Sequence, residues 1–116
     1  MTQRGDVVIV DFPYSDGGGK VRPVVVVQND VDNRRLRKTV IAMITGNLRR
    51  AAEPTHLLID PRTVEGAASG LNGPSLATCV NLYTVEQSDV RRTIGHLSDV
   101  LKRQLDNCLK AALDLP

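Results

Sequence analysis

The sequence predicts a small, mainly β domain, built as a strongly curved sheet or barrel with one α-helix at its C-terminus. Short segments rich in valine and isoleucine recur along most of the chain. Stretches rich in glycine and proline separate them. A helical spacing of apolar residues appears only after Ser98. A chain of 116 residues fits a single domain, 1–116, and no repeat or linker divides it.

The strands are expected where β-branched residues gather between turn signals. The segment RPVVVVQ has an unbroken apolar run, which indicates burial on both faces of the sheet. The segment SLATCVNLYTV is long enough for one or two strands. We expect strands at Asp6–Phe12, Arg22–Gln28, Thr39–Thr45, Thr55–Asp60, Ser75–Val85 and Thr93–Leu97.

The connections and the C-terminal segment complete the expected fold. The polar stretch Asn29–Lys38 is predicted to hold a short helical piece, and Pro61–Pro74 to be irregular because it is rich in proline and glycine. After Ser98, apolar residues recur on one face of a helix. Ser98 is a favourable N-cap, and Asp99 in the first turn suits the helix dipole.

Composition excludes several classes of protein. No apolar segment is long enough to span a bilayer, and the N-terminal run lacks a signal-peptide cleavage site, so we expect a cytoplasmic protein. The net charge of +2 is weak evidence for an anionic partner. Aromatic residues make up 3% of the chain, which disfavours binding that stacks bases on several rings. Cys79 and Cys108 lie in apolar patterns and are predicted to be buried free thiols.

Familiar catalytic patterns are missing from the sequence. His56 and His96 are far apart, and no pattern of metal-ligand spacing accompanies them, so we expect neither a metal nor another cofactor. A serine triad lacks its GxSxG turn. The stretch GGGK is followed by valine and a strand, so it is not a phosphate-binding loop.

Arg22 is the first candidate for chemistry. The following Pro23 biases Arg22 toward extended backbone, so its side chain is aimed from the start of a strand. A guanidinium is planar, keeps its charge and can hold two phosphate oxygens at once. By spacing alone, a surface ion pair is the commoner role for such an arginine, and that alternative stays open here.

Thr45 is the second candidate. It ends the predicted strand TVIAMIT, directly before the turn residues Gly46 and Asn47. Strand ends over a rigid scaffold are good places for polar contacts with a ligand. A threonine at such a position more often serves the turn itself, so the residue alone does not decide between the two roles.

The order of these segments resembles the MazF/PemK family of toxin endoribonucleases. The resemblance runs through RGDVVIVDF, KVRPVVVVQND, TVIAMITGNLRRA and EPTHLLI, and resumes at SLATCVNLYTV and TIGHLSDVLKRQLDNCLKAALDL. It covers nearly the whole chain apart from Pro61–Pro74. The resemblance implies an SH3-like barrel with a C-terminal helix, working as a homodimer. It also implies metal-independent, sequence-specific cleavage of single-stranded RNA, with Arg22 and Thr45 as the catalytic residues.

The resemblance further implies which positions contact RNA. Its substrate-binding positions correspond here to Pro13, Asp16, Gly19, Lys20, Asn29, Asp30, His56, Ser75 and Asn81. Two departures concern base recognition. Asn81 stands where family members often carry glutamine, which is one methylene longer, and Pro74 replaces an acidic residue common before the serine.

The resemblance implies a partner as well as a substrate. Toxins of this family pair with a cognate antitoxin that presents an acidic, partly disordered tail, and the mild positive charge suits such a tail. Two alternatives are a barrel toxin that poisons gyrase by protein contact, without chemistry, and a catalytically weak RNA-binding homologue. The C-terminus ALDLP lacks the tryptophan-containing tail that resemblance to the gyrase poisons would require.

Overall fold

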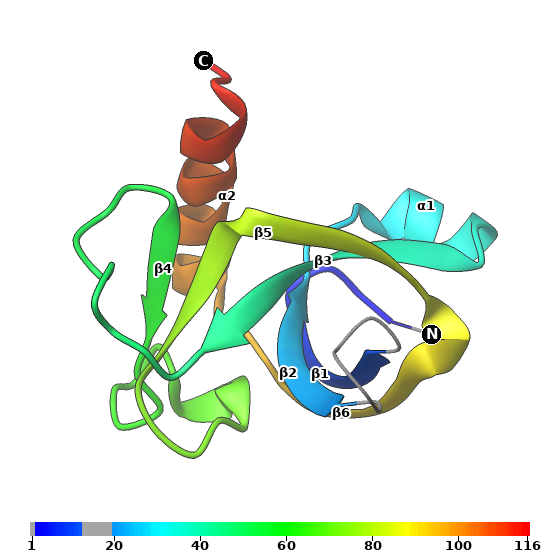
Figure 1. Ribbon diagram of the computed structural model, residues 1–116, viewed down its shortest axis with the longest axis horizontal. Coiled ribbons are helices and arrows are strands. Elements are labelled where there is room, and N and C mark those ends of the chain that lie inside the picture. The colour runs from blue at the N-terminus through cyan, green and yellow to red at the C-terminus, as the bar shows by residue number, and fades with distance from the viewer. Residues whose placement is uncertain (1, 13–19) are drawn as a thin grey trace.

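Six antiparallel strands form one curved sheet in the computed structural model, which describes residues 2–12 and 20–116 (Figure 1). The strands lie in the order β4-β5-β3-β2-β1-β6. Two short 3-10 turns, η1 and η2, and two α-helices complete the fold. Their bounds are β1 Asp6–Phe12, β2 Lys20–Val26, α1 Asp30–Arg35, β3 Lys38–Thr45, β4 His56–Ile59, η1 Ala67–Ser69, β5 Ser75–Glu86, η2 Gln87–Asp89, β6 Val90–His96 and α2 Asp99–Leu113.

The predicted mainly β fold with a C-terminal helix is confirmed, and most elements lie where valine and isoleucine gather. The prediction for the second strand was shifted, because β2 begins at Lys20 and ends at Val26. Gln28 leaves the strand because its side-chain amide turns to bond Asn33 Oδ1 and the Lys38 carbonyl. The last strand is longer than expected and begins at Val90.

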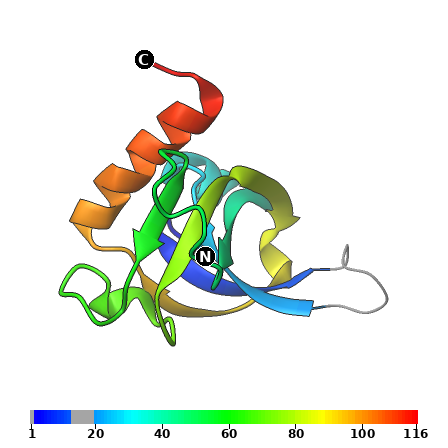
Figure 2. The same ribbon diagram turned by 60° about the vertical axis from the view of Figure 1, so that its left-hand side comes forward.

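The sheet has two faces with different surroundings. The helix face, which α2 covers, holds a core that includes Val7, Val25, Ala42, Leu57 and Leu105. Figures 1 and 2 show α2 lying beside β4 and β5 on this side. The opposite face, here called the groove face, curls around a second core of Val8, Val10, Val24, Val26, Ile41 and Val85. Because alternate residues of a strand point to opposite faces, these two cores assign a face to each strand residue.

Strand β5 changes face in its middle. Met43 pairs with Thr78, but the next residue of β3, Ala42, pairs with Leu82, so Cys79, Val80 and Asn81 form a bulge. Before the bulge the even-numbered residues of β5 share a face with Met43, and after it the odd-numbered ones do. One strand therefore serves both cores, with its side chains in opposite phase on the two sides of the bulge.

A close approach of backbones joins β6 to η1. A Cβ added at Gly95 would lie 2.3 Å from the carbonyl oxygen of Ala68 and from the carbonyl carbon of Ser69. Gly70 has φ +73°, and a Cβ there would lie 2.0 Å from the Ile94 carbonyl oxygen. Neither position has room for a side chain, so glycine is required at both.

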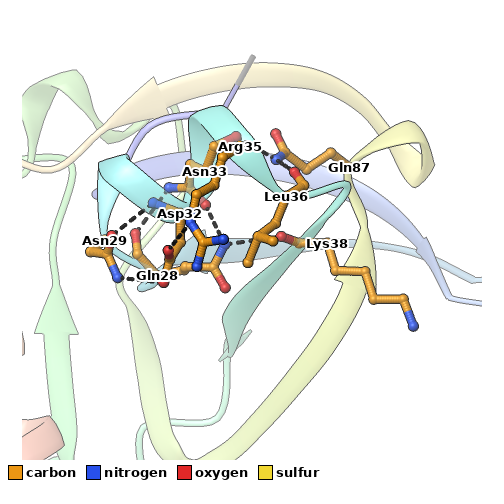
Figure 3. A network of polar contacts seen from close by, with 8 residues as sticks. All are labelled: Gln28, Asn29, Asp32, Asn33, Arg35, Leu36, Lys38 and Gln87. Carbon is orange, nitrogen blue, oxygen red and sulfur yellow. Dashed lines mark hydrogen bonds and ion pairs between the residues drawn. The ribbon is translucent and has the colours of Figure 1, made fainter.

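The connection between β2 and β3 is held by a polar network around the buried side chain of Asn33 (Figure 3). Asn33 is 2% exposed; its Nδ2 donates to the Gln28 carbonyl at 2.9 Å and its Oδ1 accepts from Thr39 Oγ1. Gln87 donates to the carbonyls of Asn33 and Leu36. The network satisfies polar groups that would be costly to bury unpaired, and it joins α1 to β3 and η2.

Helix α2 begins as predicted. Ser98 is its N-cap, with the side-chain oxygen accepting from the Leu101 backbone N–H at 3.2 Å. Its buried face carries Leu101, Leu105 and Cys108. In the described part of the chain, neither α2 nor any other helix has the length and apolar character needed to cross a membrane.

Candidate functional site

A groove of about 680 Å³ opens on the groove face, where the ends of several strands meet. Strand positions determine which side chains reach it. Arg22 lies in line with Val24 on β2, and Thr45 lies in line with Met43 on β3. His56 on β4 and Thr78 on β5 add polar groups to the same face, and the β5 bulge adds Asn81.

Arg22 and Thr45 come together through the β2–β3 register. The structure pairs Val24 with Met43, and continuing this antiparallel register by two residues sets Arg22 opposite Thr45. Both side chains line the groove. The two candidates for chemistry therefore lie on the same face of neighbouring strands and line the same hollow.

The groove has a positive lining. The Arg22 side chain is exposed and has no ion pair within residues 2–12 and 20–116, unlike Arg50, which pairs with Glu53 at 3.2 Å. The alternative of a surface ion pair for Arg22 thus finds no partner among the described residues. Arg49 also lines the groove, so three guanidinium groups face one hollow, an arrangement that attracts a polyanion.

The Thr45 hydroxyl serves the turn and keeps its proton available. Its Oγ1 accepts a hydrogen bond from the Asn47 backbone N–H at 3.2 Å. This is the turn role that the sequence left open. An accepted bond fixes the oxygen while the hydroxyl hydrogen can still be donated to a ligand, because a hydroxyl is both donor and acceptor.

His56 is almost buried beside the groove. Its Nδ1 lies 2.9 Å from Thr55 Oγ1 and 3.9 Å from Glu53 Oε1. Its Nε2 has no hydrogen-bond partner within the described residues. Since the residue is 8% exposed and lines the groove, Nε2 is the ring atom left for a ligand.

Not all the predicted RNA-binding residues meet in this groove. Pro13, Asp16 and Gly19 lie outside the described residues, and Lys20 is placed only as the first residue of β2. Ser75 donates to the Gly73 carbonyl at 3.0 Å and lies in a separate hollow of about 480 Å³.

Asn29 and Asp30 have structural partners instead of places in the groove. The Asn29 side chain caps α1 by accepting from the Asp32 backbone N–H at 2.8 Å (Figure 3). Asp30 Oδ1 accepts from the Arg4 backbone N–H at 2.7 Å. That hydrogen bond is the main cause lowering the pKa of the Asp30 carboxyl. Both residues therefore order the β2–α1 connection next to the barrel.

Thr78 is a groove residue that sequence reasoning missed. It is 4% exposed, and its Oγ1 is buried with no hydrogen-bond partner in the described structure. The only signal in the sequence was its two-residue spacing from Leu76. That spacing indicates a shared face but not which face, because the bulge that follows reverses the phase of β5.

Other chemistry in or near the groove is disfavoured by its surroundings. The Cys79 thiol follows Thr78 in sequence but belongs to the helix-face core. Burial, with Cys108 nearby, raises the pKa of Cys79 to about 12, so the nucleophilic thiolate is scarce at neutral pH. Within residues 2–12 and 20–116, no three metal-ligating side chains gather in one place.

Comparison with known proteins agrees with this fold. Residues 3–113 match the family model described as PemK-like, MazF-like toxin of type II toxin–antitoxin system. The chain is 29% identical to the endoribonuclease MazF of Staphylococcus saprophyticus, over 99% of this chain and 93% of that protein.

Solved structures give the same picture. The Mycobacterium tuberculosis toxin MazF-mt6 superposes with a TM-score of 0.78 at 28% identity, covering 96% of this chain and 98% of that one. A mycobacterial endoribonuclease, solved in complex with its cognate antitoxin, superposes with a TM-score of 0.79 at 22% identity. That match covers 100% of this chain and 98% of the other, and it bears on the fold alone.

Proposed function

The chain belongs to the PemK-like, MazF-like toxins of type II toxin–antitoxin systems, and from this we propose that it is a metal-independent endoribonuclease that cleaves single-stranded RNA. One observation carries the proposal: Arg22 and Thr45, from neighbouring strands, line one positively charged groove. The RNA-cleaving activity named for the staphylococcal relative supports the same assignment.

The reaction uses the substrate's own nucleophile. The ribose 2′-oxygen attacks the adjacent phosphorus, the bond from phosphorus to the 5′-oxygen breaks, and one proton passes overall from the 2′-hydroxyl to the leaving 5′-oxygen. The products are a 2′,3′-cyclic phosphate and a 5′-hydroxyl. Negative charge builds on the non-bridging oxygens on the way, so a fixed cation and a fixed donor are what the reaction needs.

Arg22 and Thr45 match these two needs. The Arg22 guanidinium binds the non-bridging oxygens, and the Thr45 hydroxyl donates to the same phosphate while Asn47 holds its oxygen. Because no step requires a Lewis acid when such groups are in place, cleavage proceeds in the presence of a chelator.

Two substitutions test the assignment. Arg22→Ala and Thr45→Val are each expected to lower the rate of RNA cleavage by on the order of 10²–10³, since each removes one group that stabilises the developing charge. The measurement is single-turnover cleavage of a mixed RNA pool in EDTA, with the chemistry of the new ends mapped.

The matched control is Arg103→Ala, which removes one exposed positive charge from α2. It is expected to cut RNA like the wild type. A folded Arg22→Ala protein that cuts RNA at the normal rate would contradict the assignment. A folded Arg22→Ala protein that is still toxic without cutting RNA would favour the protein-contact type of toxin.

The groove also suggests how the toxin is held inactive. The three groove arginines offer binding sites for the acidic, partly disordered tail of a cognate antitoxin, which would fold on binding and exclude RNA. RNA cleavage that persists at saturating antitoxin would contradict this exclusion of RNA from the groove.

We also propose that the toxin is a homodimer and that toxin and antitoxin both lie in the cytoplasm. Equilibrium sedimentation measures the molar mass of the toxin in solution and so tests the dimer.

A further inference from the structure

The unpaired hydroxyl of Thr78 is the strongest feature of the groove that the cleavage reaction does not use. A buried polar group without a partner costs free energy, and such groups are rare in native proteins. Thr78 Oγ1 is the one buried side-chain nitrogen or oxygen left without a partner among the described residues, and its residue lines the groove.

The sheet register places this hydroxyl between two other groove residues. Thr78 pairs with His56 on β4 and with Met43 on β3. All three side chains share the groove face, and His56 Nε2 is also without a partner among the described residues. Two unsatisfied hydrogen-bonding groups thus occupy neighbouring strands, on rigid backbone, beside the proposed cleavage centre.

The pair is set apart from the scissile phosphate. Arg22 and Thr45 lie on β2 and β3, whereas Thr78 and His56 lie on β5 and β4, farther along the strand order. Adjacent strands are about 4.8 Å apart, so the pair faces a neighbouring nucleotide and not the reacting phosphorus.

We propose that Thr78 and His56 together read the hydrogen-bonding edge of one RNA base next to the cleavage site, which makes Thr78 a specificity-determining residue. The proposal rests on the proposed function. A hydroxyl and an imidazole Nε2 can between them supply a donor and an acceptor, as a base edge requires. Binding the matching base pairs both groups, and a base with the wrong pattern leaves the buried Thr78 hydroxyl unpaired.

The neighbouring Met43 allows the base to reach the hydroxyl. Met43 is half-buried, lines the groove and pairs directly with Thr78. Its unbranched side chain changes rotamer at low cost, so it can make room beside Thr78 when a base enters.

The experiment compares cut-site preference in the wild type with that in Thr78→Val and Thr78→Ser. Each protein is incubated with a random RNA pool and the new 5′-hydroxyl ends are sequenced, after which kcat/KM is measured on the preferred sequence and on its single-base variants. For Thr78→Val the preference at one position is expected to fall about tenfold to a hundredfold, because valine keeps the shape but removes the hydroxyl. Thr78→Ser is expected to retain the preference.

The unfolding temperature of Thr78→Val and a control substitution at Thr84 show whether a change in cut-site preference comes from the lost hydroxyl. Thr78→Val is expected to unfold at the same or a higher temperature than the wild type, because no hydrogen bond within the protein is lost. Thr84→Val makes the same change at an exposed position of β5 outside the groove and is expected to leave preference unchanged.

The outcomes separate the two proposals. Equal preference in Thr78→Val and wild type at every position overturns the base-reading role while leaving RNA cleavage in place. A large fall in the unfolding temperature of Thr78→Val also overturns it, because the hydroxyl would then be paired within the native protein. A wild-type protein that cuts no RNA removes the proposed function and this inference with it.

Discussion

At the scale of single residues, a side chain's neighbours decide whether it can act. The Arg22 side chain and the Thr45 hydroxyl proton are uncommitted among the described residues, although the Thr45 oxygen is held by its own turn. Asn29 and Asp30 lie close to Arg22 in sequence, yet their polar atoms are engaged in ordering α1. Closeness in sequence to Arg22 therefore does not show whether a residue lines the groove or orders the structure beside the groove.

The two cysteines give a prediction at this scale. Burial raises the pKa of both thiols, that of Cys79 to about 12, so at pH 8 both stay protonated. In the native protein we expect neither thiol to react with iodoacetamide at the rate of a free cysteine, and both to react once urea unfolds the chain. Peptide mass mapping measures the modification. Rapid labelling of Cys79 in the native state would contradict its burial in the core.

Much of the candidate site could be predicted, but for unequal reasons. The sequence singled out Arg22 and Thr45 and a family resemblance implied their roles, and the β2–β3 register then explains why a strand start and a strand end line the same groove. Thr78 could not be predicted, because its importance depends on an unpaired oxygen and on the phase of β5. Neither property is visible in a pattern of apolar residues.

At the scale of elements, the apolar pattern predicted where the strands lie more accurately than it predicted the residues at which they begin and end. The segment Asp6–Phe12 was placed correctly because its alternating faces are filled by two different cores. The start of β2 was missed because the preceding glycines gave no apolar signal for Lys20. The start of β6 was missed because its first residues, Val90 to Arg92, are mostly polar and half-exposed or exposed.

The contact between β6 and η1 gives a prediction about stability. Gly95→Ala is expected to lower the free energy of unfolding by about 1–3 kcal/mol, because its Cβ would meet backbone atoms that cannot move aside easily. Urea denaturation followed by circular dichroism measures the change.

Gly73→Ala is the matched control for this contact. Nothing lies within 4 Å of a Cβ added at Gly73, and its φ is not in the left-handed region. The control is expected to be neutral or slightly stabilising. If Gly95→Ala were as stable as the control, the close packing of η1 against β6 would be wrong.

At the scale of the whole molecule, charge is distributed unevenly although the net charge is only +2. Arg22, Arg49 and Arg50 line one groove, whereas several other arginines lie in ion pairs elsewhere, such as Arg4 with Asp106 and Arg91 with Asp11. A modest net charge thus coexists with a locally positive surface, which composition alone could not reveal.

This distribution predicts the salt dependence of RNA binding. If the three groove arginines each neutralise one phosphate, log K against log salt concentration should have a slope of about −2, at roughly 0.7 per phosphate of a single strand. Fluorescence anisotropy of a labelled RNA, with the Thr45→Val protein to slow cleavage, measures it. Adding Arg49→Ala should reduce the slope by about 0.7, whereas adding Arg103→Ala should not change it. Equal slopes for these two double variants would exclude Arg49 from the RNA path.

The bulge of β5 makes one stretch of this strand tolerant of a change in length. Three residues separate Thr78 from Leu82, although these two lie on opposite faces, with Leu82 against the helix-face core and Val85 in the other core. If one of the three were lost, plain alternation from Thr78 would still bring Leu82 to the helix face, because two residues would then separate them. The same loss elsewhere in β5 would turn over every later side chain, so single-residue deletions in this strand should survive only between Thr78 and Leu82.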